Sequence, residues 1–259
     1  GNSATYQLTL KVYRDCSNTS NSKLDNQINI KIFYAHNDQL YQTLAVNLIT
    51  ATNVLPNCID STVACIQEGI YRRNVTLSTP TSTAFYGFNL VWARCCRNSG
   101  LTNIPDNQGQ LWAAFIPSHT YKNNSVQYLN IPVPFLCRNR ENTFNLNAFD
   151  PDGDSLVFRL VRPYRAGSTF CPSPNEATFP CNQSDLVPPY RLINYRNGYS
   201  ETLPFGVGSS VSINSTTGEI TALVNQNGNY VLAIEVEEFR KTKTGYVSMG
   251  TTRRDIQYI

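Results

Sequence analysis

Apolar and polar residues alternate with a period of two along most of this chain. In the range 6–13 apolar residues occupy every second position, and the range 27–34 repeats the pattern. Successive side chains of a strand point to opposite faces of its sheet, so this alternation predicts half-buried antiparallel strands. The same alternation at 230–237, and short runs of strand-forming residues bounded by turn residues, predict further strands at 40–49, 71–77, 85–93, 111–116, 128–135, 143–146, 156–161, 211–214, 230–237, 245–249 and 252–259. Long amphipathic helices are not predicted, and the expected fold class is therefore all-β.

The chain of 259 residues is long enough to form two domains, each with its own core. The polar stretch at 118–125 lacks any periodicity, and we place the domain boundary there. This predicts two antiparallel β-sandwich domains, at 1–125 and at 126–259. Trp92 and Trp112 lie in apolar strands of the first domain, so both are expected in its core.

The second half contains a long segment at 163–206 that is rich in proline, serine and asparagine. Loops of this length are usually functional or disordered, and a local Cys171–Cys181 disulfide would stiffen this one. We interpret the segment as a surface insertion and as the best candidate for a contact surface. Its aromatic residues either form an exposed binding face or pack beneath the loop, and we slightly favour packing. They are Tyr164, Phe170, Phe179, Tyr190, Tyr195 and Tyr199.

The chain has eight cysteines, an even number, which predicts disulfides formed in an oxidising compartment and hence an exported protein. They are Cys16, Cys58, Cys65, Cys95, Cys96, Cys137, Cys171 and Cys181. A local bridge between Cys58 and Cys65 is expected. A structural zinc site is not favoured, because no Cys-x-x-Cys pair occurs and the two histidines lack zinc-like spacing to any cysteine.

Two of the cysteines are adjacent, at the end of the strand predicted at 85–93. Neighbouring strand residues point to opposite faces, so Cys95 and Cys96 are each expected to bond a different distant partner. Cys16 and Cys137 are the natural candidates. Eight cysteines allow 105 connectivities, and the sequence alone does not choose among them.

Three carboxylates stand at alternating positions of one predicted turn, at Asp150, Asp152 and Asp154, with Gly153 as the turn former. Calcium takes about six to eight oxygen ligands, and such a turn lets neighbouring carboxylates converge. The turn is not an EF-hand, because no glutamate follows at the required distance and a strand is predicted at 156–161. An ordinary acidic turn between two strands is the alternative.

The second half resembles the cadherin-like immunoglobulin repeats of bacterial surface proteins. The resemblance rests on DPDGDSL at 150–156, VSINSTTGEI at 211–220 and GNYV at 228–231. It implies immunoglobulin- or cadherin-like sandwiches, with Ca²⁺ bound by the turn carboxylates near an interdomain junction. The implied ligands are Asp150, Asp152 and Asp154, with Glu235, Glu237 and Glu238 of the late strand as weaker additions.

The first half is similar to the N-terminal region of large Bacteroidota cell-surface proteins of the gliding-motility-associated, type IX-secreted group. The matching segments are YQLTLKVYRDC at 6–16, CCRN at 95–98, NI at 103–104, EFR at 238–240 and RRDIQ at 253–257. The resemblance implies a cell-surface location, and we expect neighbouring domains in a longer protein. The same bacteria attach O-glycans at Asp-Ser or Asp-Thr, which makes Ser61, and less favourably Ser155, candidate acceptors.

Charge and motifs exclude several classes of function. The 21 Lys and Arg against 18 Asp and Glu give a dispersed net charge of +3, which does not favour nucleic acid or a membrane surface. No apolar run approaches the ~20 residues that a membrane span needs. The nucleophile elbow, the zinc-protease motif and the phosphate-binding glycine loop are all missing from the sequence, so we predict that the protein is not an enzyme.

We therefore expect a non-catalytic extracellular module of a bacterial surface adhesin or filament, stiffened by disulfides and by calcium. A carbohydrate-binding module that recognises surface polysaccharide is the nearest alternative, and it requires an exposed aromatic platform. A fibre subunit that assembles by strand addition is the third possibility. It requires an unpaired edge, at 6–13 or at 252–259.

Overall fold

The computed structural model describes residues 2–16, 23–54, 65–79, 87–106, 108–117, 122–131, 134–167 and 186–258. Within these ranges it contains strands and no α-helix, which confirms the all-β prediction. The strands are β1 (Asn2–Asp15), β2 (Gln27–Tyr34), β3 (Leu40–Asn53), β4 (Ile66–Thr79), β5 (Phe88–Arg94), β6 (Gln110–Ile116), β7 (Gln127–Tyr128), β8 (Glu141–Asn145), β9 (Ala148–Phe149), β10 (Ser155–Val161), β11 (Ser210–Ile213), β12 (Glu219–Leu223), β13 (Tyr230–Thr242) and β14 (Gly245–Tyr258).

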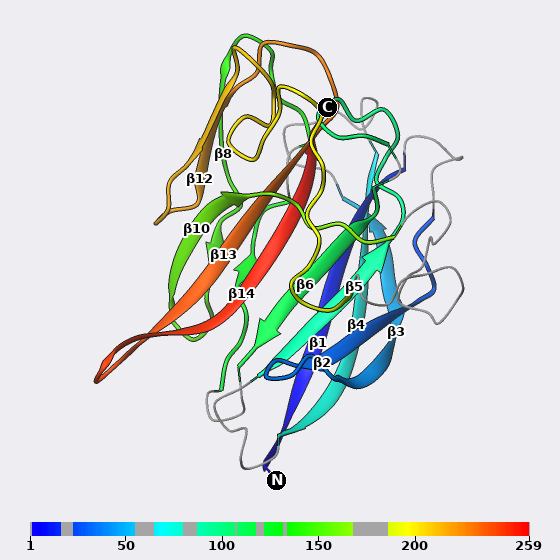
Figure 1. Cartoon of the computed structure of the whole chain (residues 1–259), viewed down its shortest axis with the longest axis vertical. Helices are drawn as coiled ribbons and strands as arrows, with labels where there is room; N and C mark the ends of the chain where they lie inside the picture. Colours follow the sequence, from blue (N-terminus) through cyan, green and yellow to red (C-terminus); the bar gives the residue numbers. More distant parts are fainter. Residues whose placement is uncertain are drawn as a thin grey trace.

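Most strands belong to one large antiparallel sheet of nine strands, in the order β1-β4-β3-β2-β5-β6-β14-β13-β10. Figure 1 shows this curled sheet, with β1 to β6 on one side of the molecule and β14, β13 and β10 on the other. A three-stranded sheet, β11-β12-β8, packs beside the second group, and β7 pairs with β9. The β13–β14 hairpin extends beyond the body of the molecule.

Three of the predicted strands differ from the observed ones. The strands expected at 245–249 and 252–259 form the single strand β14, because Gly250 stays in the ladder opposite Glu238 and a register shift follows at Phe239. The strand expected at 128–135 is reduced to β7, which has two residues. Pro132 and Pro134 lack the backbone N–H that a longer ladder would need.

Each half of the chain has its own hydrophobic core. The first cluster includes Ile30, Ile32, Tyr71 and Leu77, and the second includes Phe205, Ile220, Leu232 and Tyr258. Trp92 is 5% exposed within the first cluster, which confirms its predicted place in the core, whereas Trp112 is only partly buried and packs against this cluster.

The large sheet continues across the predicted domain boundary. Ala114 and Phe115 of β6 pair with Thr252 and Thr251 of β14. A third apolar cluster also contains residues of both halves, among them Val91 and Leu111 from the first half and Ala166 and Leu186 from the second. The halves therefore share both a sheet and buried surface, and their division into domains 1–125 and 126–259 stays a prediction.

The described parts of the insertion pack against the body of the molecule. Leu186 and Ile193 are fully buried, and Tyr164 and Tyr190 make an edge-on ring contact with centroids 5.0 Å apart. The hydroxyl of Tyr195 is also buried. Tyr164, Tyr190 and Tyr195 therefore pack against the body of the molecule, which is the alternative that the sequence analysis slightly favoured. The other insertion residues named above, Phe170, Phe179, Cys171 and Cys181, lie outside the described residues.

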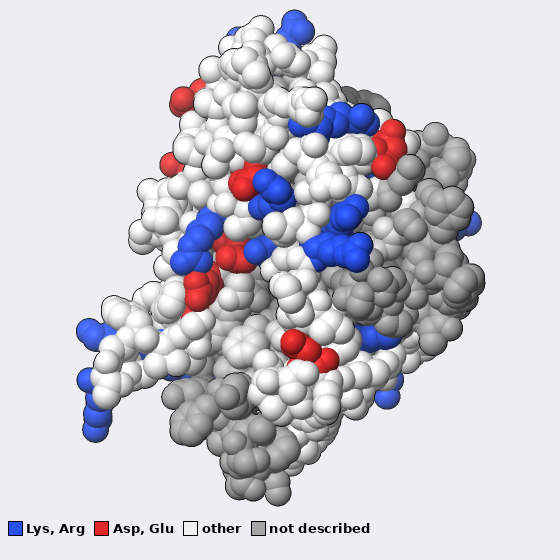
Figure 2. All heavy atoms as spheres, viewed as in Figure 1, with Lys and Arg blue, Asp and Glu red and all other residues white. Residues whose placement is uncertain are grey.

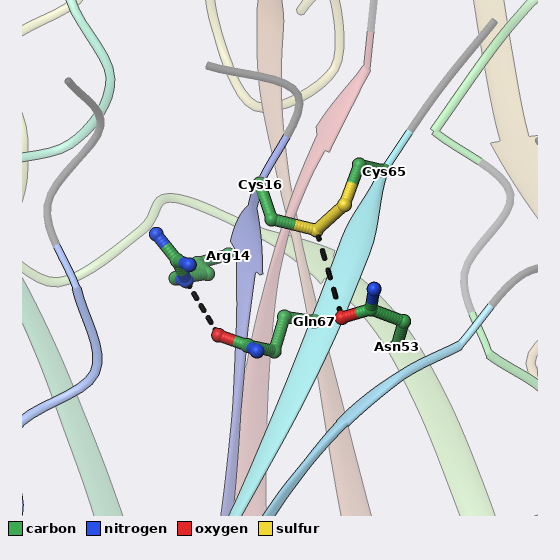
Figure 3. Close-up of a disulfide and its surroundings, with 5 residues drawn as sticks. All are labelled: Arg14, Cys16, Asn53, Cys65 and Gln67. Carbon is green, nitrogen blue, oxygen red and sulfur yellow. Dashed lines mark hydrogen bonds between the residues drawn. A yellow bond between two sulfur atoms is a disulfide. The ribbon is translucent and has the colours of Figure 1, made fainter. Parts of the chain in front are cut away.

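The disulfides differ from the expected pairing. Cys16 bonds Cys65 (Figure 3), so the expectation that Cys65 pairs locally with Cys58 is wrong. The cause is the register of β1 and β4, which places Asp15 opposite Ile66. Cys16 follows Asp15 and Cys65 precedes Ile66, so the two cysteines lie side by side. Their backbones are joined as well, since the amide of Cys16 donates to the carbonyl of Cys65 at 2.9 Å.

Cys95 and Cys96 form a disulfide with each other, so the expectation of two distant partners is wrong. That expectation assumed that both residues belong to a strand, whereas β5 ends at Arg94. Cys137, the other proposed partner, carries an exposed, free thiol. Cys58 lies outside the described part of the chain.

Candidate cation site

The aspartate turn connects β9 to β10 and brings its three carboxylates together. Oxygen atoms of Asp150, Asp152 and Asp154 all lie within 4.8 Å of one another. Asp150 organises the turn, because its Oδ1 accepts hydrogen bonds from the backbone amides of Asp152 at 2.8 Å and Asp154 at 3.0 Å. Gly153 has a φ of 81°, a conformation that glycine adopts without steric cost.

Arg240 of β13 is the cation that faces this turn. Its Nε and Nη2 donate to the two carboxylate oxygens of Asp154, both at 2.7 Å, and Nη2 also lies 3.3 Å from Oδ2 of Asp152. The Asp154 side chain is only 3% exposed, so this two-bonded pair is well shielded from water. The hydrogen bonds to Asp154 raise the pKa of Arg240 further above its ordinary value.

The segment that joins the two halves of the chain is fixed to the same turn. The backbone amide and the side-chain amide of Asn124 donate to Asp152, at 2.6 and 2.9 Å. The backbone hydrogen bond from Asn124, followed by its side chain and by Arg240, holds the pKa of Asp152 below its ordinary range. Arg240 donates in turn to the carbonyl of Lys122 at 2.7 Å and to Oδ1 of Asn123 at 3.0 Å.

Glu238 is the fourth carboxylate near this turn, and it is completely buried. It accepts hydrogen bonds from the backbone amide of Val126 at 2.9 Å and from Nδ2 of Asn123 at 2.8 Å. Burial raises the pKa of Glu238, and the negative charges of Asp150 and Asp154 act in the same direction. Glu238 was only a weaker candidate from the sequence, yet Asn123 links this carboxylate to Arg240, which bonds the turn.

Glu237, expected as a metal ligand, does not face the turn. Successive residues of β13 point to opposite faces of the sheet, so Glu237 points away from the face of Glu238 and Arg240. It pairs instead with Arg159 at 2.8 Å and accepts a hydrogen bond from Ser248. Over β10, β13 and β14, Figure 2 shows acidic and basic side chains next to one another, as these ion pairs require.

The donor set does not fit a calcium ion while Arg240 occupies it. Oδ2 of Asp150 is buried without a hydrogen-bond partner and is the one oxygen of this carboxylate that an ion could still use. Both oxygens of Asp154 are bonded to Arg240, and both oxygens of Asp152 accept from Asn124. Calcium needs about six to eight oxygens, so one remaining oxygen is far too few.

Comparison with known proteins gives no match, either to a family model, to a curated protein or to a solved structure. Among the described residues, no helix has the length and apolar character to cross a membrane. Of the two candidate glycan acceptors, Ser155 is exposed as the first residue of β10, and Ser61 lies outside the described residues.

A buried arginine joins the two halves of the chain at a second place, which the sequence analysis did not identify. Arg97 follows the adjacent cysteines, and its side chain is 2% exposed. It forms an ion pair with Asp255 of β14 and donates to the carbonyls of Gly109 and of Tyr164, the latter at 2.7 Å. Arg97 therefore links the region that follows β5 to β14 and to the start of the insertion.

Proposed function

We propose that this chain is a non-catalytic extracellular module of a bacterial surface adhesin or filament, with a structural role. The observation that carries the proposal is the buried Arg97–Asp255 ion pair, which ties the two halves into one body. The continuous sheet and the Cys16–Cys65 disulfide support the same conclusion, because cross-links between distant segments resist extension and suit an oxidising environment. Its partners are neighbouring domains or subunits of a larger surface protein.

The state of the acidic side chains supports a non-catalytic role. A general acid or base must be free to exchange its proton with a substrate. Asp154 is held by two bonds from Arg240, and Glu238 is buried with both oxygens accepting hydrogen bonds. Glu235 is similarly bonded to Arg253, at 2.7 Å. These three carboxylates are thus occupied by partners within the chain.

Assembly by strand addition is a second candidate function, favoured by the position of β1. This strand is at one end of the nine-stranded order and pairs only with β4, over its whole length of 14 residues. The other proposed strand lies within β14, which stands between β6 and β13. Of the two terminal strands, β1 is therefore the one that offers an edge to an added strand.

A carbohydrate-binding role has less support. Trp92 belongs to the core, and the other aromatic residues considered are partly buried: Trp112, Tyr164, Tyr190 and Tyr195. A flat platform for sugar rings would need exposed aromatic faces. Surface polysaccharide therefore stays a proposed partner only on the basis of side chains other than these aromatic residues.

The proposal is tested by labelling intact cells of the source bacterium with an antibody raised against this chain. We expect surface labelling that disappears when the gene is deleted and when type IX secretion is disabled. The adhesion or gliding of the cells should decline in the deletion strain. Labelling that appears only after the cells are permeabilised would contradict an extracellular role. Normal adhesion and gliding in the deletion strain would contradict the adhesin or filament role.

A further inference from the structure

We propose that Arg240 is the resident cation of the aspartate turn and occupies the place where a calcium ion was expected. The turn and the segment that joins the halves are then held together by a guanidinium group instead of a metal ion. This inference is independent of the proposed function, since it concerns the stability of the junction and not its biological partner.

The oxygens that Arg240 gathers carry the argument. There are five of them: Oδ1 and Oδ2 of Asp154, Oδ2 of Asp152, Oδ1 of Asn123 and the carbonyl oxygen of Lys122. Two carboxylates, a side-chain amide and a backbone carbonyl are the ligand types that calcium takes in proteins. The guanidinium therefore fills a set of oxygens that has the chemistry of a calcium site.

An ion and Arg240 cannot share these oxygens. Calcium lies about 2.3–2.6 Å from each of its oxygens, whereas the guanidinium nitrogens already lie 2.7–3.3 Å from them. An ion among the same oxygens would overlap the guanidinium and bring a second positive charge against it. Among the carboxylate oxygens of the turn, only Oδ2 of Asp150 has no hydrogen-bond partner, and a single oxygen does not hold calcium.

The geometry also explains how the junction is fixed without a metal. Asn123 accepts a hydrogen bond from Arg240 and donates one to Glu238, so it links two side chains on the same face of β13. Asn124 binds Asp152 with its backbone and side-chain amides. Arg240 is thus the centre of a network that joins the connecting segment, the turn and β13.

The experiment compares thermal unfolding of the whole chain in millimolar CaCl₂ and in EDTA. A ligand that binds only the folded state raises its midpoint, so the parent midpoint should be the same in both solutions, within about 1 °C. Arg240→Gln should lower the midpoint by about 4 °C or more in EDTA, because Asp154 then remains buried without a counter-charge. Dialysed parent protein should contain no bound calcium by elemental analysis.

The matched control is Arg159→Gln, which also removes an arginine that pairs with β13. Arg159 is 45% exposed, so its removal should shift the midpoint by less than about 2 °C. A calcium-dependent midpoint in the parent protein would overturn the proposal, as would an Arg240→Gln variant no less stable than this control.

If Arg240→Gln does not fold, Arg240→Lys is measured instead. Lysine keeps the positive charge but cannot donate the two parallel hydrogen bonds to Asp154, so the unfolding midpoint should fall and should not depend on calcium. A calcium-dependent midpoint of Arg240→Lys would also overturn the proposal.

Discussion

Asn103 pairs its side-chain amide with both backbone groups of Val231, as a neighbouring strand would. Its Oδ1 accepts from the amide of Val231 at 3.1 Å, and its Nδ2 donates to the carbonyl of Val231 at 2.8 Å. Strand β10 ends at Val161, opposite Ala233, so it does not reach this part of β13. Asn103 is completely buried and provides the hydrogen bonds that the missing strand residues would have made.

Replacement of Asn103 by aspartate should destabilise the protein by about 3 kcal/mol, because Nδ2 is lost and a carboxylate then faces two backbone carbonyls in a buried site. The second of these carbonyls belongs to Pro204, at 3.1 Å. Urea denaturation measures the change. Asn130→Asp is the control, because Asn130 makes a comparable bond to the carbonyl of Asn145 on an exposed surface. Equal losses in the two variants would contradict the strand-like role of Asn103.

The strands were predictable because each depends on a local pattern. Alternation in the range 27–34 reflects the burial of one face of a sheet, and the run of strand-forming residues at 156–161 follows a turn. The observed strands β2 and β10 agree closely with both ranges. The order of the strands was not predictable in this way. The pairing of β6 with β14 joins positions that are far apart in the sequence, and no local signal encodes it.

In the candidate site, too, residues close together in the sequence were predictable and their distant partners were not. The three aspartates were identified because they belong to one turn, whereas Arg240, their counter-charge, is 86 positions from Asp154. Period-two alternation could have shown that Glu238 and Arg240 share a face of the strand and that Glu237 does not. The disulfides were missed for a similar reason, because the register of β1 against β4 decides the partner of Cys16.

The buried Arg97–Asp255 ion pair should be among the most costly interactions to break. Arg97→Gln or Asp255→Asn should each destabilise the protein by about 3–5 kcal/mol, since either change leaves the other member of a shielded pair without its charge partner. A double-mutant cycle by chemical denaturation measures the coupling between the two side chains. The exposed pair Arg159–Glu237 serves as the comparison, with an expected coupling of about 0–1 kcal/mol. A coupling energy between Arg97 and Asp255 as small as that between Arg159 and Glu237 would contradict the role of the buried pair in holding the halves together.

The Cys16–Cys65 disulfide should stabilise the protein by about 2–4 kcal/mol, because it closes a loop of 49 positions in the unfolded chain. The Cys16→Ser, Cys65→Ser double variant should lose this amount in chemical denaturation. Cys137→Ser is the control and should leave stability unchanged, because that thiol is free and exposed. Peptide mapping without reduction should recover Cys16 and Cys65 in one cross-linked product, and a product that joins Cys58 to Cys65 would refute the pairing.

Asp152 should make the stability depend on pH in the acid range. Its pKa is depressed in the folded state, so its contribution is present above the unfolded value of 3.8 and is lost as the pH falls through the lower folded value. Asp152→Asn should therefore be less stable than the parent at neutral pH, and the difference should shrink below about pH 3.8. Denaturation of both proteins across this range measures it. A difference that stays constant with pH would mean that the charge of Asp152 is not involved.

Removal of Arg240 with a small side chain should convert the turn into a calcium site. In Arg240→Ser four of the five oxygens that bonded the guanidinium lose this partner, whereas Oδ2 of Asp152 still accepts from the amide of Asn124, and water supplies the rest of the six to eight ligands that calcium takes. We expect this variant to bind Ca²⁺ in isothermal titration and to gain a higher unfolding midpoint in CaCl₂ than in EDTA. The double variant Arg240→Ser, Asp154→Asn should lose both responses, because the buried carboxylate is the principal charged ligand. Failure of the single variant to bind calcium would show that these oxygens do not converge on one ion.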